Sequence, residues 1–209
     1  MSLGVLLTLE GPEGSGKSTQ GRWLVQRLRQ TGYRAVFLRD PGSTALGRAL
    51  RRGLLHSRVK LSPLAEALLF IGARVALVEQ RIVPALRRGM VVVCDRYHDS
   101  TMAYQGFGGQ LDVARLERLG RDAIRGIMAR LTILLDLPTS AGFARLHRAR
   151  DRMERKTRAF HQRVRKGYLT LASREPRRFA VIDASRPAGE IRRQIEAVVR
   201  SRLKRTMSR

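Results

Sequence analysis

The sequence predicts an α/β protein in which a five-stranded parallel sheet lies between two layers of helices. Five short apolar runs read as buried strands, at 5–9, 35–38, 90–94, 131–137 and 179–183, and stretches with helical spacing separate them. Strands that alternate with helices favour a parallel sheet, since each crossover needs about a dozen residues or more. The chain has 209 residues, 43% of them hydrophobic, which is enough to bury the core of one such domain. We expect one domain over 1–204 and a basic tail at 205–209.

The glycine-rich loop after the first strand carries the strongest chemical signal. Gly11 and Gly16 are separated by four residues and are followed by Lys17 and Ser18, which is the phosphate-loop pattern. Glycines let backbone N–H groups turn toward phosphate oxygens, and the N-terminus of the next helix adds a favourable dipole. Lys17 would reach the outer phosphates and Ser18 would place its hydroxyl on Mg²⁺. A glycine turn that only caps a helix is the alternative, but the flanking strand and helix favour a nucleoside triphosphate site. The predicted loop comprises Gly11, Pro12, Glu13, Gly14, Ser15, Gly16, Lys17, Ser18 and Thr19.

The positive charge of the chain has two interpretations. Lys and Arg number 42 against 17 Asp and Glu, a formal net charge of +25. Such an excess attracts anions and can hold nucleic acid without sequence preference. The basic residues are spread over many segments, however, and aromatic residues make up only 5% of the chain. We therefore favour solvated helix faces over a surface that binds nucleic acid specifically.

The remaining composition argues for a protein of the cytoplasm. No apolar run approaches the roughly 18 residues that would span a bilayer, and the N-terminus lacks a signal-peptide pattern. Cys94 is the single cysteine, which excludes an internal disulfide, and its apolar strand makes it a core residue rather than a nucleophile. No Cys/His cluster indicates a tightly bound metal.

The second strand runs into a polar, turn-rich stretch at 39–44. Ligands of open α/β sheets bind at the carboxyl ends of strands, so this stretch is a candidate part of the site. A short helix is predicted at 45–57 and a long one at 63–89. Phe70 and Arg74 are four residues apart on the long helix and share a face. They could stack on a planar base and donate to its carbonyl oxygen, or they could be a core phenylalanine beside a surface arginine.

The third strand ends in Asp95 and Arg96. A carboxylate at this place could position Mg²⁺, and a guanidinium could clamp a phosphate with paired donors. A salt bridge at the end of the strand is the alternative. The polar groups at 100–105 follow directly and have the size to contact a base or a sugar.

The second half of the chain predicts further helices and a cover over the site. An amphipathic helix is expected at 111–128, a packed helix around 160–171, and a final helix that includes 191–199. Between them, a helix that begins at Ser140 leads into an arginine-rich patch at 145–154. Few apolar residues anchor this patch, which predicts a mobile cover whose arginines offset charge on a transferring phosphoryl group. A solvated helix is the alternative.

Taken in order, several of these stretches resemble the thymidylate kinases, a family of P-loop nucleoside monophosphate kinases. The stretches are 11–18, 39–44, 69–74, 82–86, 95–106 and 151–154. The similarity spans nearly the whole chain, and the combination is specific where a phosphate loop alone is generic. It implies the three-layer P-loop NTPase fold, a short arginine-rich lid at about 145–157, and a homodimer.

The resemblance implies a donor site for ATP and Mg²⁺. ATP phosphates would bind in the loop at 11–19, Arg186 would flank adenine, and Ser18 with Asp95 would hold the metal. The side chains implied in catalysis are Lys17, Arg39, Asp95, Arg96, Arg148 and Arg150, with Arg152 also in the lid.

The resemblance also implies an acceptor site for dTMP. Arg39 and Arg96 would hold the acceptor phosphate, Phe70 would stack on thymine, and Tyr104 would crowd the ribose 2′ position. Glu13 would approach the sugar. The side chains implied in this site are Glu13, Arg39, Phe70, Arg74, Arg96, Thr101, Tyr104 and Gln105.

Four positions depart from the family pattern. Asp40 and Ser43 stand where the family usually has Glu and Gly, and Lys156 and His161 stand where it often has Glu and Phe. The last two put in question the acidic contacts of the lid. The prediction is phosphorylation of dTMP by Mg·ATP. The alternatives are a related nucleotide or nucleoside kinase and a nucleic-acid-binding P-loop protein.

Overall fold

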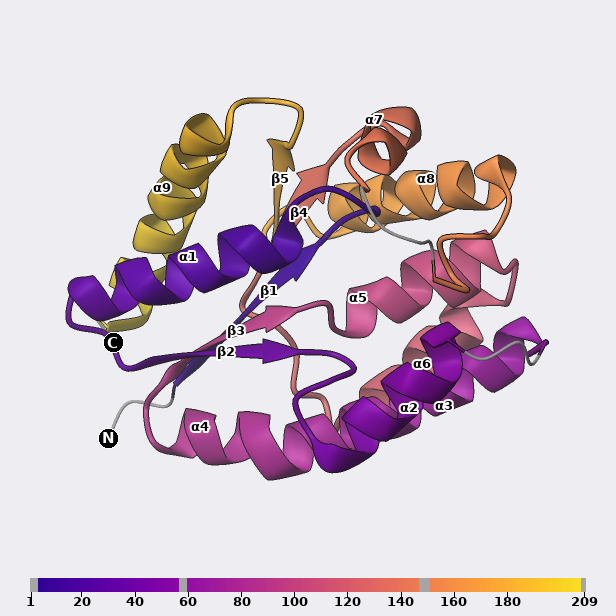
Figure 1. Ribbon diagram of the computed structural model, residues 1–209. Coiled ribbons are helices and arrows are strands. Elements are labelled where there is room, and N and C mark those ends of the chain that lie inside the picture. The colour runs from indigo at the N-terminus through magenta and orange to yellow at the C-terminus, as the bar shows by residue number, and fades with distance from the viewer. Residues whose placement is uncertain (1–3, 57–59, 147–150, 208–209) are drawn as a thin grey trace.

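A computed structural model describes residues 4–56, 60–146 and 151–207 and confirms the predicted α/β architecture (Figure 1). The sheet has five strands in the order β2-β3-β1-β4-β5, and every neighbouring pair is parallel. The strands are β1 (Val5–Glu10), β2 (Ala35–Arg39), β3 (Val91–Asp95), β4 (Leu131–Asp136) and β5 (Phe179–Asp183). All five predicted strands are present within two residues of their predicted ends.

Helices cover both faces of the sheet, as Figure 1 shows. The α-helices are α1 (Lys17–Gln30), α2 (Ala45–His56), α3 (Pro63–Leu77), α4 (Val83–Arg87), α5 (His98–Thr101), α6 (Val113–Ala123), α7 (Thr139–Ala144), α8 (Arg158–Arg174) and α9 (Ala188–Met207). Two π-helical segments are η1 (Val78–Ile82) and η2 (Met102–Gly108). Because α3, η1 and α4 follow one another directly, they form the long helix that the apolar spacing predicts.

Alternation along the strands divides the core between the two faces. Leu7 and Leu9 of β1 pack with α1 and α9 on one face. Leu6 of β1 and Cys94 of β3 point to the other face, where they pack with Ile82 of η1. A third cluster joins α3, η2, α6 and α8. Cys94 is buried in this core, as predicted.

The C-terminal ends of α6 and α9 differ from the sequence prediction. The helix expected at 111–128 ends at Ala123, because Arg125 and Gly126 adopt left-handed φ angles of 51° and 69° that reverse the chain. The last helix continues to Met207, three residues into the segment predicted as a basic tail. In the described part of the chain, no helix is long and apolar enough to cross a membrane.

The strand order places the carboxyl ends of β2, β3 and β1 side by side. Arg39 at the end of β2 is in register with Asp95 at the end of β3, and Asp95 is in register with Leu9 of β1. The phosphate loop leaves β1 at the same edge. This is the edge of an open parallel sheet at which ligands bind.

Candidate active site

The phosphate loop connects β1 to α1 and carries a buried lysine. Lys17 Nζ donates hydrogen bonds to the carbonyl oxygens of Gly11 at 2.9 Å and of Pro12 at 2.7 Å. Burial lowers the pKa of Lys17 to about 8. Gly14 has a φ of +70°, and a Cβ there would lie 2.1 Å from the carbonyl oxygen of Gly142 in α7. Only glycine therefore fits this turn of the loop.

Ser18, Arg39 and Asp95 come together beside the loop, although they stem from three different elements. The Ser18 hydroxyl donates to Asp95, Arg39 Nη2 donates to Ser18 Oγ at 2.5 Å, and Arg39 Nε lies 3.3 Å from Asp95 Oδ2. No group of three or more His, Cys, Asp and Glu side chains in the described residues could hold a metal. A hydroxyl beside a carboxylate nevertheless fits Mg²⁺, which is commonly held by one or two protein oxygens together with phosphates and water.

Arg96 occupies the centre of the site. Its backbone has a φ of 67°, a left-handed conformation unusual for a residue other than glycine. Its guanidinium donates to Glu13 at 2.8 Å, to Tyr104 OH at 3.0 Å, and to Ser100 and Tyr168 at 3.2 Å each. Burial works against the charge, but the attraction of Glu13 raises the pKa of Arg96 well above its usual value. A fixed cation therefore lies at this point at every physiological pH.

Glu13 is the ionised partner of Arg96. Burial favours its neutral form, but Arg96 and Lys17 hold the pKa of this carboxyl at about 2. Tyr104 OH donates to Glu13 Oε1 at 2.6 Å. The resemblance implies that Glu13 and Tyr104 contact the acceptor sugar and that Arg96 holds the acceptor phosphate. In the structure, both Glu13 and Tyr104 are hydrogen-bonded to Arg96.

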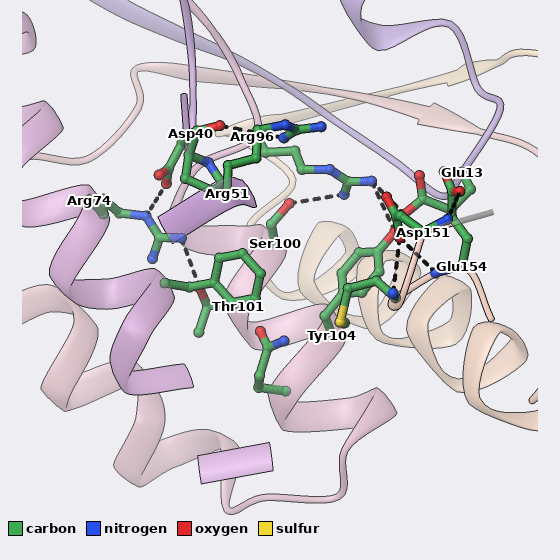
Figure 2. A pocket seen from close by; sticks show the side chains of 14 residues that line it. Glu13, Asp40, Arg51, Arg74, Arg96, Ser100, Thr101, Tyr104, Asp151 and Glu154 are labelled. Atoms are coloured by element: carbon green, nitrogen blue, oxygen red, sulfur yellow. Dashed lines mark hydrogen bonds and ion pairs between the residues drawn. The ribbon is translucent and has the colours of Figure 1, made fainter. Parts of the chain in front are cut away.

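The pocket beside α3 contains the predicted base-binding side chains (Figure 2). Buried Arg74 donates from Nε to Asp40 Oδ2 and from Nη2 to Thr101 Oγ1 at 2.8 Å. Among the described residues, Arg74 Nη1 is a buried donor without a hydrogen-bond partner. Phe70 lines the same pocket. An apolar ring beside an unsatisfied donor fits a planar base that has a carbonyl oxygen.

Two pockets meet at a common wall. The α3 pocket is lined by Glu13, Asp40, Pro41, Arg51, Phe70, Arg74, Arg96, Ser100, Thr101, Tyr104, Gln105, Asp151, Met153 and Glu154. The loop pocket is lined by Glu13, Gly14, Gly16, Lys17, Ser18, Thr19, Arg39, Arg51, Asp95, Arg96, Leu146, Asp151 and Glu154. Glu13, Arg51, Arg96, Asp151 and Glu154 line both pockets. A ligand in one pocket therefore lies next to a ligand in the other.

Three site residues escape the sequence analysis. Arg51 of α2 lines both pockets, and burial together with the nearby Arg39 and Arg96 lowers its pKa. Glu10 of β1 accepts from Ser100 Oγ at 2.6 Å and from Tyr168 OH at 3.0 Å, the two hydroxyls that also contact Arg96. Burial raises the pKa of Glu10 to about 7. The available signal for Glu10 is an acid at the end of an apolar strand, whereas Arg51 and Tyr168 resemble their helical neighbours in the sequence.

The predicted lid is only partly described. Arg148 and Arg150 lie outside the described residues. In the second half of the arginine-rich patch, Met153 is 5% exposed and packs into the core beside α3 and α8. The mobile cover stays a prediction. Arg186, assigned to adenine, is exposed near Asp183 and lines neither pocket.

The four departures from the family pattern each have a contact in the structure. Ser43 Oγ accepts from the backbone N–H of Arg39 at 2.8 Å, and Asp40 accepts from Arg74. Lys156 Nζ lies 2.9 Å from Glu66 Oε1. The His161 ring packs edge-to-face on Phe143 with their centroids 4.8 Å apart.

Comparison with known proteins gives a consistent result. The sequence model of the thymidylate kinase family matches residues 9–195. A thymidylate kinase of Synechococcus sp. (strain JA-2-3B'a(2-13)) is 47% identical over 199 residues, which cover 95% of this chain and 96% of the relative. A thymidylate kinase of Deinococcus radiodurans is 45% identical over 204 residues, or 97% and 99% of the two chains.

The fold agrees with these sequence relatives. The crystal structure of thymidylate kinase from Ehrlichia chaffeensis superposes with a TM-score of 0.78 at 29% identity, covering 94% of this chain and 98% of that one. The family match spans both pockets and the sheet edge between them. The chain belongs to the thymidylate kinase family.

Proposed function

We propose that this protein transfers the γ-phosphoryl group of Mg·ATP to dTMP, giving dTDP and ADP. The observation that carries the proposal is the wall shared by the loop pocket and the α3 pocket. Triphosphate in the first and monophosphate in the second would face each other across Arg96. Direct transfer requires this proximity, because the attacking and leaving oxygens must align with the phosphorus between them.

The reaction needs little proton transfer from the protein. An oxygen of the dTMP phosphate is already a nucleophile, so it forms the new bond to the γ-phosphorus while the bond to the β–γ bridging oxygen breaks and ADP leaves. Lys17, Arg39 and Arg96 would hold and neutralise the phosphate oxygens. Ser18 and Asp95 would hold Mg²⁺, which supplies further positive charge when it is bound. Arg51 belongs in the same set, because it lines both pockets.

The α3 pocket supports selection of a thymine nucleotide. Phe70 would stack on the ring, and the unsatisfied Nη1 donor of Arg74 would meet a carbonyl oxygen. Tyr104, held by Glu13 and Arg96, would crowd a ribose 2′ hydroxyl. Gln105 adds a side-chain amide to the pocket wall.

A panel of acceptors tests the function. Purified protein with Mg·ATP is offered dTMP, dUMP, dCMP, dGMP and thymidine, and ADP formation is followed in a coupled assay. We expect the highest kcat/KM for dTMP. Preference for another monophosphate or for thymidine would move the assignment to a related kinase. No turnover with any acceptor, together with DNA binding that survives physiological salt, would favour the nucleic-acid-binding alternative.

We also propose that the protein is a cytoplasmic homodimer whose interface includes α3 and α6. Leu64 and Leu68 of α3 are 52% and 50% exposed, and Leu119 of α6 is 42% exposed. Leu64 and Leu119 line one surface groove with Leu111 and Leu116. Grouped apolar side chains of this size typically contact a partner, and a second copy would bury the same patch on both chains.

A further inference from the structure

Glu66 of α3 is a buried acid that the reaction described above does not use. It is 1% exposed, and three side chains converge on its carboxylate. Arg152 Nη1 lies 2.7 Å and Lys156 Nζ 2.9 Å from Oε1, and Gln105 Nε2 lies 3.4 Å from Oε2. Two of these partners belong to residues 151–156, which we call the wall segment. A single carboxylate thus faces two cations of the wall segment.

The wall segment borders both nucleotide pockets. Asp151 and Glu154 line the loop pocket and the α3 pocket alike, and Met153 lines the α3 pocket. The segment contacts the rest of the protein through Met153 in the core and through Lys156, whose Nζ lies 4.9 Å from the centroid of the Phe160 ring. Arg152 also donates to the carbonyl oxygen of Leu54 in α2 at 2.6 Å. Glu66 is the carboxylate of α3 that pairs with both of these cations, Arg152 and Lys156.

The position of Glu66 on α3 connects this attachment to the base site. Residues 66, 70 and 74 are spaced four apart and follow one another along one face of the helix. Phe70 and Arg74 line the α3 pocket, and Gln105, which also lines it, contacts Glu66. The face that receives the base therefore also carries the anchor of the wall segment.

We propose that Glu66 is a positioning residue that preorganises the wall shared by the donor and acceptor pockets. The inference rests on the proposed function, because it takes the two ligands to be ATP and dTMP. Without the carboxylate, Arg152 and Lys156 lose their common partner, and partly buried cations that repel each other favour release of the wall segment. Both pockets then lack a wall for part of the time.

Preorganisation makes a specific thermodynamic prediction. If the wall is in place for only a fraction of the time, the Kd of each nucleotide that binds alone equals its wild-type Kd divided by that fraction. The first nucleotide to bind restores the wall, so the second binds nearly as well as it does to the wild type. Loss of Glu66 should therefore weaken both ligands singly and create positive cooperativity between them.

The experiment compares wild type and Glu66→Gln by isothermal titration calorimetry, with dTMP and the non-hydrolysable analogue Mg·AMP-PNP as probes. Each probe is titrated alone and with the other at saturation. We expect each Kd alone to rise about five- to ten-fold in Glu66→Gln, and to return to within about two-fold of the wild-type value when the other probe is bound.

Other results overturn the proposal. If neither Kd changes, the wall does not depend on Glu66. If dTMP binds more weakly but Mg·AMP-PNP binds as it does to wild type, Glu66 has a local role in the base pocket. If both probes bind more weakly and still do so when the other probe is bound, the substitution damages the fold in general. Glu196→Gln is the control, because Glu196 also pairs with an arginine, Arg27, but lines neither pocket. Its Kd values should equal those of wild type.

A second variant covers failure of Glu66→Gln to fold. Arg152→Gln breaks the ion pair between Arg152 and Glu66 by changing its more exposed partner, since the Arg152 side chain is 14% exposed. This variant should show the same gain of cooperativity between the two probes. Unchanged cooperativity in a folded Arg152→Gln protein contradicts the proposal. The wild-type assay keeps the two claims apart. An inactive wild type contradicts the kinase assignment, whereas an active wild type whose Glu66 variant binds in the same way contradicts only the role of Glu66.

Discussion

The guanidinium of Arg96 is held in place by side chains of the protein itself. It donates to Glu13, Ser100, Tyr104 and Tyr168, and its left-handed backbone directs it into the site from the end of β3. A cation held in this way needs little reorganisation when negative charge develops beside it. The proposed catalysis depends on such fixed charges rather than on a titrating base.

Lys17 provides the first prediction at the scale of single residues. Lys17→Ala should lower kcat by at least about 100-fold, because the outer phosphates lose a buried ammonium group. The fold should survive, since among the residues that the structure describes the lysine donates only to groups of its own loop. Activity is measured by coupled ADP release and folding by circular dichroism. Lys166→Ala, at an exposed position in α8, is the control and should match wild type. Near-full activity of Lys17→Ala would contradict the mechanism.

His98 of α5 predicts a loss of stability in mild acid. Both ring nitrogens lack a partner in the described structure, and burial lowers the pKa to about 4 from 6.5. The charged groups that face it are Arg74, Asp99, Arg121 and Arg178. Its folded pKa is the lower one, so the unfolded chain binds the proton first. Its stabilising effect is complete above about pH 6.5 and is lost as the pH falls toward 4.

Urea unfolding between pH 7.5 and 4.5 measures this effect. The free energy of unfolding of wild type should fall by about 2.5 kcal/mol more than that of His98→Gln over this range, because the variant has no ring to protonate. Equal slopes for the two proteins would show that His98 does not titrate in the unfolding equilibrium.

At the scale of elements, α3 performs two tasks along one face. Pro63 and the Ser62 cap, whose side chain accepts from the N–H of Ala65, set where the helix begins. From that start, the four-residue spacing directs positions 66, 70 and 74 toward the pocket and the wall segment. The helix thus places base recognition and the attachment of the wall on one rigid element.

Phe70→Ala tests base recognition by α3. A base stacked on an aromatic ring is stabilised by about 1–3 kcal/mol, so the KM for dTMP should rise roughly 5- to 150-fold. The KM for ATP should change little, because Phe70 does not line the loop pocket. Steady-state kinetics with each substrate varied in turn measures both constants. Leu69→Ala changes a neighbour outside both pockets, and its KM for dTMP should stay near wild type. An unchanged KM in Phe70→Ala would place the base elsewhere.

At the scale of the whole molecule, the strand order brings the pockets together. The β2-β3-β1 arrangement sets Arg39, Asp95 and the phosphate loop along one edge of the sheet. The helices α2, α3 and η2 then surround the α3 pocket. Two binding sites drawn from distant parts of the chain meet because parallel crossovers return every strand to the same edge.

The proposed dimer gives the prediction at this scale. Leu68→Glu and Leu119→Glu should each shift the mass measured by light scattering from two chains toward one, because a buried unpaired carboxylate is unfavourable at an apolar interface. Leu46→Glu is the control, since Leu46 is 48% exposed but lies on α2, outside the patch. A wild type that runs as a single chain would contradict the dimer itself.

Much of the site could be predicted from the sequence, because the responsible patterns are local. The phosphate loop is contiguous, the strands are short apolar runs, and Phe70 and Arg74 share a helix face through spacing alone. Short-range sterics and hydrogen bonding determine these features whatever the rest of the chain does. These patterns place polar residues near the strand ends, and the family resemblance implies a role for each of them.

Only the tertiary structure decided which charges share a partner. Nothing local distinguishes Glu66, Arg51 or Tyr168 from other helical residues, yet each lies at a junction of elements that are far apart in the chain. The same holds for Met153, whose burial attaches a segment that the sequence predicted to be loosely anchored. The burial of a charge, and therefore its pairing and its pKa, depends on which elements pack against it, and that is a property of the folded chain.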